Sequence, residues 1–335
     1  MNIYNTTKVN LIVIPMYKVT ICVPIYGVEK YIDRCARSLF EQTFDNIEYV
    51  FVNDCTKDKS VDILNNVITR YPNRVKDVKI INHDKNMGLG CSRNTAVTAA
   101  TGEFILHVDS DDYLAFDCVE KAVKKQLEKN YDFVSIECAD VTPEGLHPNR
   151  THSYATKKEF LVDMINHKIR NSIWGRLIRR SLYYKNNIRV ESHVNMSEDL
   201  QVTPRLLFFA SKVAFVHEPL CFYECSNSNS YTSSFSEQKA RQQLITLKVL
   251  EDFFKDKEEC YKEAVNQRKF KIITDLCINC GKAGYDKSFY LELRHQITQF
   301  DHSYWKFLSI PKRFAFILKN YTLFCTYLNV CTKLI

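Results

Sequence analysis

Long apolar runs are missing from this chain of 335 residues. No stretch of about 18 residues is both apolar and uncharged, so the sequence predicts no membrane-spanning helix. The N-terminus holds a short apolar run, but it lacks the basic start and the small-residue cleavage site of a secretory signal. We expect residues 1–16 to form an extension ahead of the first strand.

Glycine is scarce, with eight residues, and neither common glycine-rich nucleotide-binding pattern is present. No GxxxxGK[ST] occurs, which argues against P-loop chemistry. "NMGLGCSRN" places Gly88 and Gly90 before a helix, but Arg93 stands where GxGxxG requires its third glycine. Glycines at a helix start still permit close approach of the backbone and favour phosphate. Arg93 would pair either with a phosphate or, in a structural ion pair, with nearby acids.

The 13 cysteines are irregularly spaced, and several lie inside apolar runs. Cys277 and Cys280 form a CxxC in a helix-like segment, but no second pair stands at metal-ligand spacing. We therefore interpret them as buried thiols of a cytoplasmic protein. The formal net charge of +7 suits an anionic partner, such as a nucleoside diphosphate or an acidic membrane surface. No nucleic-acid-binding motif stands out, so no nucleic-acid partner is expected.

Strand-like and helix-like segments alternate in the first third of the chain. The strand-like segments are residues 18–24, 47–54, 78–83 and 103–108, and the helix-like ones are residues 28–42, 60–71 and 91–100. This alternation predicts a parallel sheet with helices on both faces. Ligands of such sheets bind beyond the carboxyl ends of the strands.

Beyond residue 116 the alternation of strand-like and helix-like segments becomes less regular, and residues 238–300 look mostly helical. The last stretch, residues 304–335, has five basic residues, no acidic residue and many aromatic ones. Such a segment either packs on the rest of the protein as an ordinary helix or lies in a membrane interface.

Three carboxylates, Asp109, Asp111 and Asp112, end the apolar run in "FILHVDSDDYL". Like charges so close repel each other, and the sequence leaves three explanations. These are a solvated acidic turn, a general acid–base pair, or oxygen ligands for a hard divalent cation. Mg²⁺ and Mn²⁺ usually complete such sites with waters and substrate phosphates. Asp54 ends another strand and should face the same crevice, unless it only forms an Asx turn or a helix cap.

Four motifs in this order resemble the family 2 glycosyltransferases of the GT-A fold. They are "VTICVPIYGVEKYIDRCARSLFEQT", "VFVNDCTKD", "NMGLGCSRNTAVTAATGEFILHVDSDDYL" and "SEDL". The resemblance implies an α/β fold with a Rossmann-like, mostly parallel sheet flanked by helices. It implies a GT-A domain over residues 17–235, divided into a nucleotide-sugar half (17–115) and an acceptor half (116–235). Residues 236–335 would form a helical C-terminal region, with membrane association as one option.

The resemblance also implies residue roles. The donor-binding set would be Pro24, Tyr26, Asp54, Arg93, Asp109 and Ser110, with Asp54 on the base. Asp111, helped by Asp109, would hold Mn²⁺ or Mg²⁺. Asp199 of the "ED" pair would be the catalytic base, with Glu198 as its alternative.

Trp174 and Arg176, in "SIWGRLIRR", would lie beside the acceptor, although Trp174 could equally be core. The family often carries Arg or His after the aromatic residue where this chain has Tyr223 followed by Glu224. That departure puts in doubt a cationic phosphate contact at this point.

The activity implied by this resemblance is a metal-dependent, inverting transfer of a sugar from a nucleotide-sugar. The expected donor is a UDP-sugar, and the acceptor is a hydroxyl of a glycan or lipid-linked molecule in polysaccharide biosynthesis, such as capsule or lipooligosaccharide. The protein would be cytoplasmic, or peripheral on the inner face of the cytoplasmic membrane.

Two alternatives stay open. A sugar-phosphate nucleotidyltransferase usually has a glycine-rich basic loop after the first strand, where this chain reads "PIYGVEKYI". A non-catalytic sugar-nucleotide-binding module would not need both the Asp-x-Asp and the "ED" pair.

Overall fold

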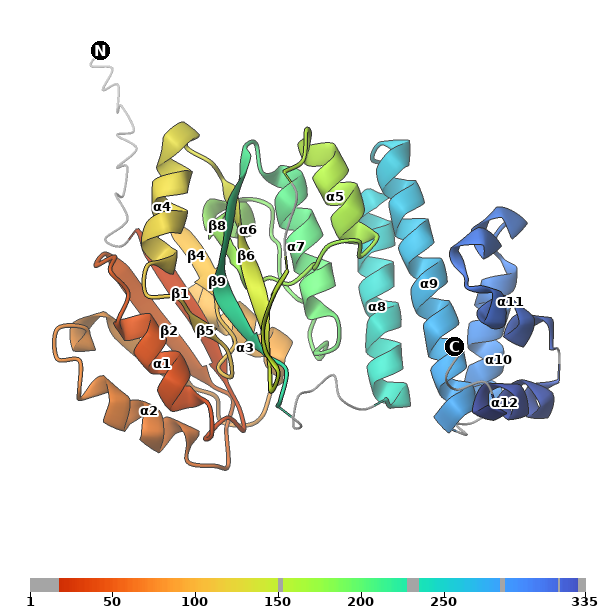
Figure 1. The fold of residues 1–335 in the computed structure, drawn as a ribbon, viewed down its shortest axis with the longest axis horizontal. Helices are drawn as coiled ribbons and strands as arrows, with labels where there is room; N and C mark the ends of the chain where they lie inside the picture. The colour runs from red at the N-terminus through yellow and green to blue at the C-terminus, as the bar shows by residue number, and fades with distance from the viewer. Residues whose placement is uncertain (1–17, 150–152, 228–234, 284–286, 319, 331–335) are drawn as a thin grey trace, which may run out of the picture.

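The structure is a computed structural model, which describes residues 18–149, 153–227, 235–283, 287–318 and 320–330. The expected N-terminal extension, residues 1–16, lies outside the described residues. In Figure 1 a sheet with helices on both faces occupies one part of the molecule, and a helical region extends from it to the opposite end.

The first half of the sheet forms as the sequence predicts. Its strands are β1 (Val19–Ile25), β2 (Ile47–Asn53), β3 (Val78–Asn82) and β4 (Phe104–His107). They lie in the order β3-β2-β1-β4, and all three pairings are parallel. The crossover helices are α1 (Ile32–Phe40), α2 (Ser60–Ile68) and α3 (Leu89–Ala99), with a 3₁₀ turn at Val75–Asp77. The predicted α/β class is confirmed.

The second half of the sheet mixes directions. Its strands are β5 (Tyr113–Leu114), β6 (Phe133–Thr142), β7 (Gly145–Asn149), β8 (Arg176–Arg179) and β9 (Val213–Glu224). Strand β8 pairs antiparallel with both β4 and β6, and β5 pairs antiparallel with β9. Strand β9 runs parallel to β6, and β7 forms a hairpin with β6. The uniformly parallel sheet that the alternation predicted is therefore limited to the pairings among β1, β2, β3 and β4.

Helices cover the sheet and then continue without strands. Those of the second half are α4 (Cys118–Lys129), α5 (Lys157–Ile165), α6 (Ser181–Lys185) and α7 (Glu198–Phe209). The C-terminal region comprises α8 (Glu237–Phe254), α9 (Glu259–Ala283), α10 (Lys287–Thr298), a 3₁₀ segment (His302–Phe307), α11 (Ile310–Ile317) and α12 (Tyr321–Val330). Within the described ranges, no helix is both long and apolar enough to cross a membrane.

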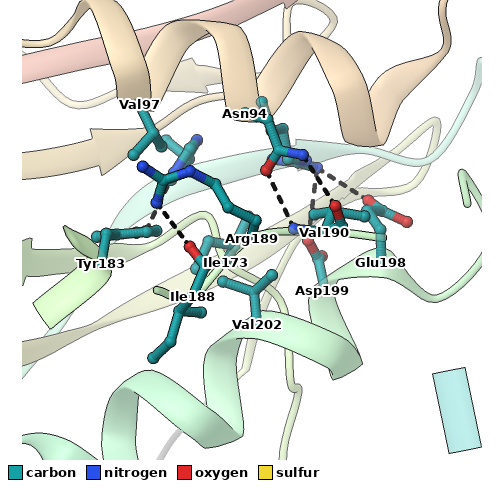
Figure 2. A pocket seen from close by; sticks show the side chains of 12 residues that line it. Asn94, Val97, Ile173, Tyr183, Ile188, Arg189, Val190, Glu198, Asp199 and Val202 are labelled. Carbon is teal, nitrogen blue, oxygen red and sulfur yellow. Dashed lines mark hydrogen bonds and ion pairs between the residues drawn. The ribbon is translucent and has the colours of Figure 1, made fainter. Parts of the chain in front are cut away.

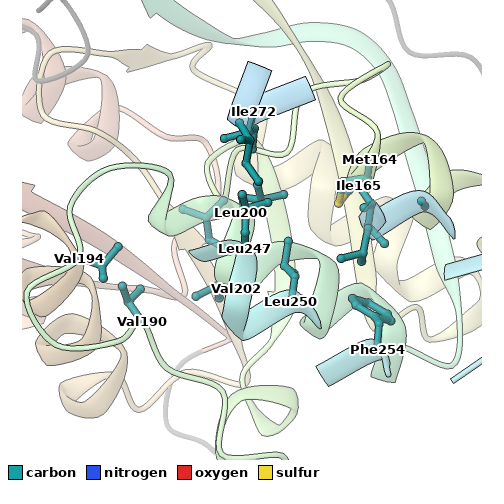
Figure 3. Packing of buried hydrophobic residues seen from close by; sticks show 14 of the residues in the cluster. Met164, Ile165, Val190, Val194, Leu200, Val202, Leu247, Leu250, Phe254 and Ile272 are labelled. Carbon is teal, nitrogen blue, oxygen red and sulfur yellow. The ribbon is translucent and has the colours of Figure 1, made fainter. Parts of the chain in front are cut away.

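Two hydrophobic cores lie on opposite faces of the sheet, because successive side chains of a strand point to opposite faces. In β2, Tyr49 and Phe51 belong to the core shared with α1, α2 and α4. Val50 and Val52 belong to the other core, which runs through α5 and α7 into the C-terminal helices. Figure 3 shows this second core where α7, α8 and α9 meet. Because this core contains side chains of both the sheet and the C-terminal helices, it stabilises the contact between the two regions.

The last helices pack on α9, as one of the two expectations for this segment proposed. Phe324 and Leu328 of α12 are fully buried. A side chain on Gly281 of α9 would come within 2.7 Å of both, so glycine allows this close packing. Cys277 and Cys280 are also buried in α9, as expected, and the 12 cysteines in the described ranges are free.

Candidate active site

The candidate site lies where β1, β2 and β4 end at the same edge of the sheet. The Asp54 amide donates to the Ile25 carbonyl, and the Val108 amide donates to the Cys22 carbonyl. Asp54 and the turn after β4 therefore flank the end of β1, in agreement with the predicted crevice. At that end Pro24 is buried in the strand, whereas the Tyr26 side chain is 52% exposed.

Asp54 is buried, and its carboxylate already binds groups of the chain itself. Its carboxylate accepts hydrogen bonds from the amides of Met87 (2.8 Å) and Gly88 (2.7 Å), and it lies 2.8 Å from a ring nitrogen of His83. These contacts fix the loop before α3 against the end of β2. The predicted contact of Asp54 with a nucleotide base stays a prediction.

The two glycines at the start of α3 do permit a close approach, but the group that approaches is another segment of the same chain. Gly88 has a φ of +89°, and a Cβ there would come within 2.2 Å of the Asn195 side chain. The Gly90 amide donates to Asn195 Oδ1, and a Cβ on Gly90 would meet the Val194 carbonyl at 2.3 Å. The segment before α7 therefore covers the start of α3, a position that sequence reasoning had considered for phosphate.

The acidic turn after β4 forces its carboxylates together. The Asp112 amide donates to the Asp109 carbonyl, which closes the turn, and Ser110 is buried within it. Burial, and then the charge of Asp109, raise the pKa of Asp111. Burial and the charges of both neighbours hold the pKa of Asp112 well above its usual range. A bound cation would offset the repulsion between these carboxylates and the loss of their hydration on burial.

The donor atoms of this turn fit a divalent cation that is shared with a substrate. Among the described residues, three buried carboxylate oxygens accept no hydrogen bond, and two of them lie near the charge of Arg93 instead. They are Asp109 Oδ1, Asp112 Oδ2 and Asp199 Oδ1, of which the first and the third lie 3.0 and 3.6 Å from Arg93 Nη2. Ionised carboxylate oxygens are acceptors only, and hard cations prefer such ligands. The described residues include no group of three side chains arranged as a complete metal site. Asp109 and Asp111 would therefore supply two ligands, and the ion would take the others from water and phosphate.

Arg93 joins this turn to the "ED" pair. Its Nη2 atom lies 3.0 Å from Asp109 Oδ1, 3.4 Å from Glu198 Oε1 and 3.6 Å from Asp199 Oδ1. The side chain is only 5% exposed, so burial alone would lower its pKa, but the three carboxylates raise it. Of the two alternatives left by the sequence, the structure shows the ion pair. A contact of Arg93 with the donor stays a prediction.

Glu198 and Asp199 begin α7 next to each other (Figure 2). Ser197 before them has a φ of +63°, a conformation that non-glycine residues seldom adopt and that is often found at functional sites. Burial, and then the charge of Asp199, raise the pKa of Glu198 to about 8. Burial also raises the pKa of Asp199. The Asp199 side chain is 19% exposed and that of Glu198 only 8%, so Asp199 is the more accessible base.

The two residues predicted to lie beside the acceptor are both buried. Trp174 is 8% exposed and stacks on Tyr223, with ring centroids 5.4 Å apart at 4°. Arg176 is buried and donates to the carbonyls of Gly175 and Arg170. Trp174 thus supports the half-buried Tyr223 ring, and Arg176 binds the backbone of Arg170, whose guanidinium lies 5.3 Å from the centre of that ring. The contact of Trp174 and Arg176 with an acceptor stays a prediction.

Glu224 stands where the family often has a cation, and the positive charge next to it comes from Arg34 of α1. Arg34 Nη2 donates to Glu224 Oε2 and to the Asp111 carbonyl, both at 2.9 Å. The guanidinium also lies 4.4 Å from the centre of the Tyr113 ring. This contact orients the turn that carries Asp111. Sequence reasoning missed Arg34 because its partner is 190 residues away and nothing in the helix marks it.

We expect glutamine at position 198 to change how stability depends on pH. Because the pKa of Glu198 is raised on folding, the folded state keeps a proton that the unfolded state loses, and stability falls as pH rises from about 4.5 to about 8. Glu198→Gln removes this loss. Its free energy of unfolding, measured with denaturant, should therefore rise relative to wild type between pH 5 and pH 8. Glu259→Gln, at an exposed carboxylate, is the control. A wild-type minus variant difference that is constant with pH contradicts the burial of this charge.

Known proteins resemble this chain in sequence and in fold. The family model described as Glycosyl transferase family 2 matches residues 20–194. EpsH of Bacillus subtilis, described as a glycosyltransferase, is 31% identical over 211 residues, which are 61% of this chain and 60% of EpsH. The chain thus spans less than two thirds of that relative.

Two solved structures share the fold. The crystal structure of Staphylococcus aureus TarS 1–349 in complex with UDP-GlcNAc has a TM-score of 0.69 at 19% identity, and the match covers 94% of this chain and 92% of that one. TarS is a poly(ribitol-phosphate) beta-N-acetylglucosaminyltransferase, of whose full length the sequence match covers 43%. The mannosyltransferase PcManGT of Pyrobaculum calidifontis, in complex with GDP-Man and Mn²⁺, has a TM-score of 0.54 at 16% identity, covering 95% of this chain and 89% of that one.

Proposed function

The chain belongs to glycosyl transferase family 2, and on that premise we propose that it is a metal-dependent, inverting glycosyltransferase. The sugar moves from a nucleotide-sugar, with UDP-sugars as the proposed class, to a hydroxyl of a glycan or lipid-linked acceptor. One observation carries the proposal: the buried guanidinium of Arg93 joins Asp109 of the Asp-x-Asp turn to Asp199. A metal-binding pair and a base are thereby held in one site.

The complexes of the two structural relatives support the donor and the ion. TarS binds UDP-GlcNAc, and PcManGT binds GDP-Man with Mn²⁺. Mn²⁺ or Mg²⁺ held by Asp111 and Asp109 would neutralise charge that develops on the leaving diphosphate. The Oδ1 atom of Asp109, which accepts no hydrogen bond, and the raised pKa of the buried Asp111 support this use of the two carboxylates.

Asp199 performs the proton transfer in this proposal. Its carboxylate takes the proton of the acceptor hydroxyl while the hydroxyl oxygen attacks the anomeric carbon. The new carbon–oxygen bond forms on the face opposite the breaking bond to the diphosphate, so the configuration inverts. Burial raises the pKa of Asp199, and the charge of Arg93 opposes that effect and favours the ionised base.

The acceptor is proposed to be a cell-surface glycan or its lipid-linked precursor. TarS acts on a poly(ribitol-phosphate), which makes polysaccharide assembly such as capsule or lipooligosaccharide synthesis a consistent setting. Assembly of this kind would place the enzyme at the inner face of the cytoplasmic membrane. The half-buried Tyr223 ring, which stacks on the buried Trp174 near the acidic turn, offers an apolar surface of the type that packs on sugar rings.

Donor turnover tests the proposal. We expect the purified chain, given a panel of UDP- and other nucleotide-sugars with Mn²⁺, to consume one donor and to lose that activity in EDTA. Release of the nucleoside diphosphate is the measurement. Metal-dependent nucleotide binding without turnover, even with glycan acceptors present, would favour the non-catalytic binding module. Consumption of a sugar phosphate with a nucleoside triphosphate would favour the nucleotidyltransferase.

A further inference from the structure

The outer face of α11 is apolar and uncovered. Ile310, Phe314 and Ile317 follow one another at helical spacing, and their side chains are 67%, 57% and 64% exposed. On the inner face of the same helix, Ala315 and Phe316 are buried. The helix is thus already seated on the protein through one face, and its opposite face needs no rearrangement to become available.

The charges beside this face are positive. Arg313 lies on α11 itself and donates to the Leu308 and Lys306 carbonyls, which brings the end of the preceding 3₁₀ segment next to the helix. Within the described ranges, no carboxylate pairs with Lys306 or Arg313, whereas Lys312 pairs with Asp275 at 2.6 Å. Residues 304–335 contain five basic residues and no acidic one.

The position of α11 leaves the face open to a large partner. Figure 1 shows α10, α11 and α12 at the opposite end of the molecule from α1 and α4. A second copy of the chain packed on this face would bring like charges together. An anionic lipid surface instead matches the positive flanks and accepts the apolar side chains.

We propose that the outer face of α11, formed by Ile310, Phe314 and Ile317 with Lys306 and Arg313 at its border, docks on an anionic lipid surface. The three apolar side chains enter the boundary between headgroups and acyl chains, and the two cations meet lipid phosphates. The proposed contact is peripheral, since the helix lies in the interface through one face while its other face stays packed on the protein. This inference does not depend on the proposed sugar transfer.

Vesicle sedimentation of the full chain tests this docking. We expect binding to phosphatidylcholine vesicles that contain phosphatidylglycerol, weaker binding to phosphatidylcholine alone, and release by high salt. Phe314→Gln combined with Ile317→Gln should lower the partition coefficient about tenfold or more, because both side chains leave the interface.

A matched control keeps the test specific. Leu127 is 64% exposed and belongs to α4, a helix that lies at the other end of the molecule in Figure 1, so Leu127→Gln should bind vesicles as the wild type does. Thermal melting verifies that each variant is folded. Equal partition of the double variant and wild type, or no binding to anionic vesicles at low salt, overturns the proposal. A wild-type dimer that the double variant dissolves, seen by light scattering, overturns it in favour of a second copy.

Discussion

Asparagine at position 199 is expected to lower kcat by about 10²–10⁴-fold, the usual contribution of a positioned general base. The amide cannot accept the proton of the acceptor hydroxyl, but it is nearly the same size as the carboxylate. Arg93 also keeps Asp109 and Glu198 as partners, so the site should stay assembled. Donor affinity, measured by calorimetry with Mn²⁺ and a nucleoside diphosphate, should therefore change little.

Glu198→Gln is the matched variant for this experiment. Glu198 is the more buried acid, so its loss should reduce kcat far less than the loss of Asp199. If Asp199→Asn turns over at the wild-type rate, Asp199 is not the base. If Glu198→Gln is the inactive variant instead, the base role moves to Glu198.

Asparagine at position 111 is expected to remove most activity through the donor rather than through proton transfer. Asp111 is one of two carboxylates that would hold the divalent cation, and Asn227 Nδ2 already donates to its Oδ2 at 2.8 Å. An amide is a weaker ligand than a carboxylate for a hard cation. We expect donor affinity in Mn²⁺ to fall to the level of wild type in EDTA, with a loss of turnover of about 10²-fold or more.

Asp62→Asn is the control for this substitution, because Asp62 is an exposed aspartate on α2. It should match wild type in both measurements. The pattern that separates the two predictions is clear: Asp111→Asn weakens nucleotide binding, and Asp199→Asn leaves it intact. Unchanged metal dependence in Asp111→Asn would show that the cation binds elsewhere or is not required.

The first half of the fold was predictable because its signals are local. Each strand from β1 to β4 is a short apolar run, and each crossover helix has its own periodicity. Parallel order then follows from the alternation itself. The position of β8 was not predictable, because Arg176–Arg179 is a short segment that inserts antiparallel between β4 and β6. Its place depends on pairing with two strands that are distant in the sequence.

The site residues also fall into those that local sequence marks and those that only distant contacts reveal. The sequence indicated Asp109, Asp111 and the "ED" pair, because acids after an apolar run and at a helix start are visible in a few residues. It left Arg93 between a phosphate and an ion pair, and Arg93 and Glu198 are 105 residues apart. It did not find Arg34, and it left Trp174 open between the acceptor site and the core, since burial is a property of everything that packs around a side chain.

The sequence by itself determined the parallel α/β half, the acidic turn at the end of β4 and the motifs that place the chain in its family. Only the tertiary structure decided which charges meet. Ion pairs depend on separations of a few ångströms and on exclusion of water, and neither is encoded in spacing along the chain. For that reason the links from Arg93 to Asp199 and from Arg34 to Glu224 emerged only in the folded protein.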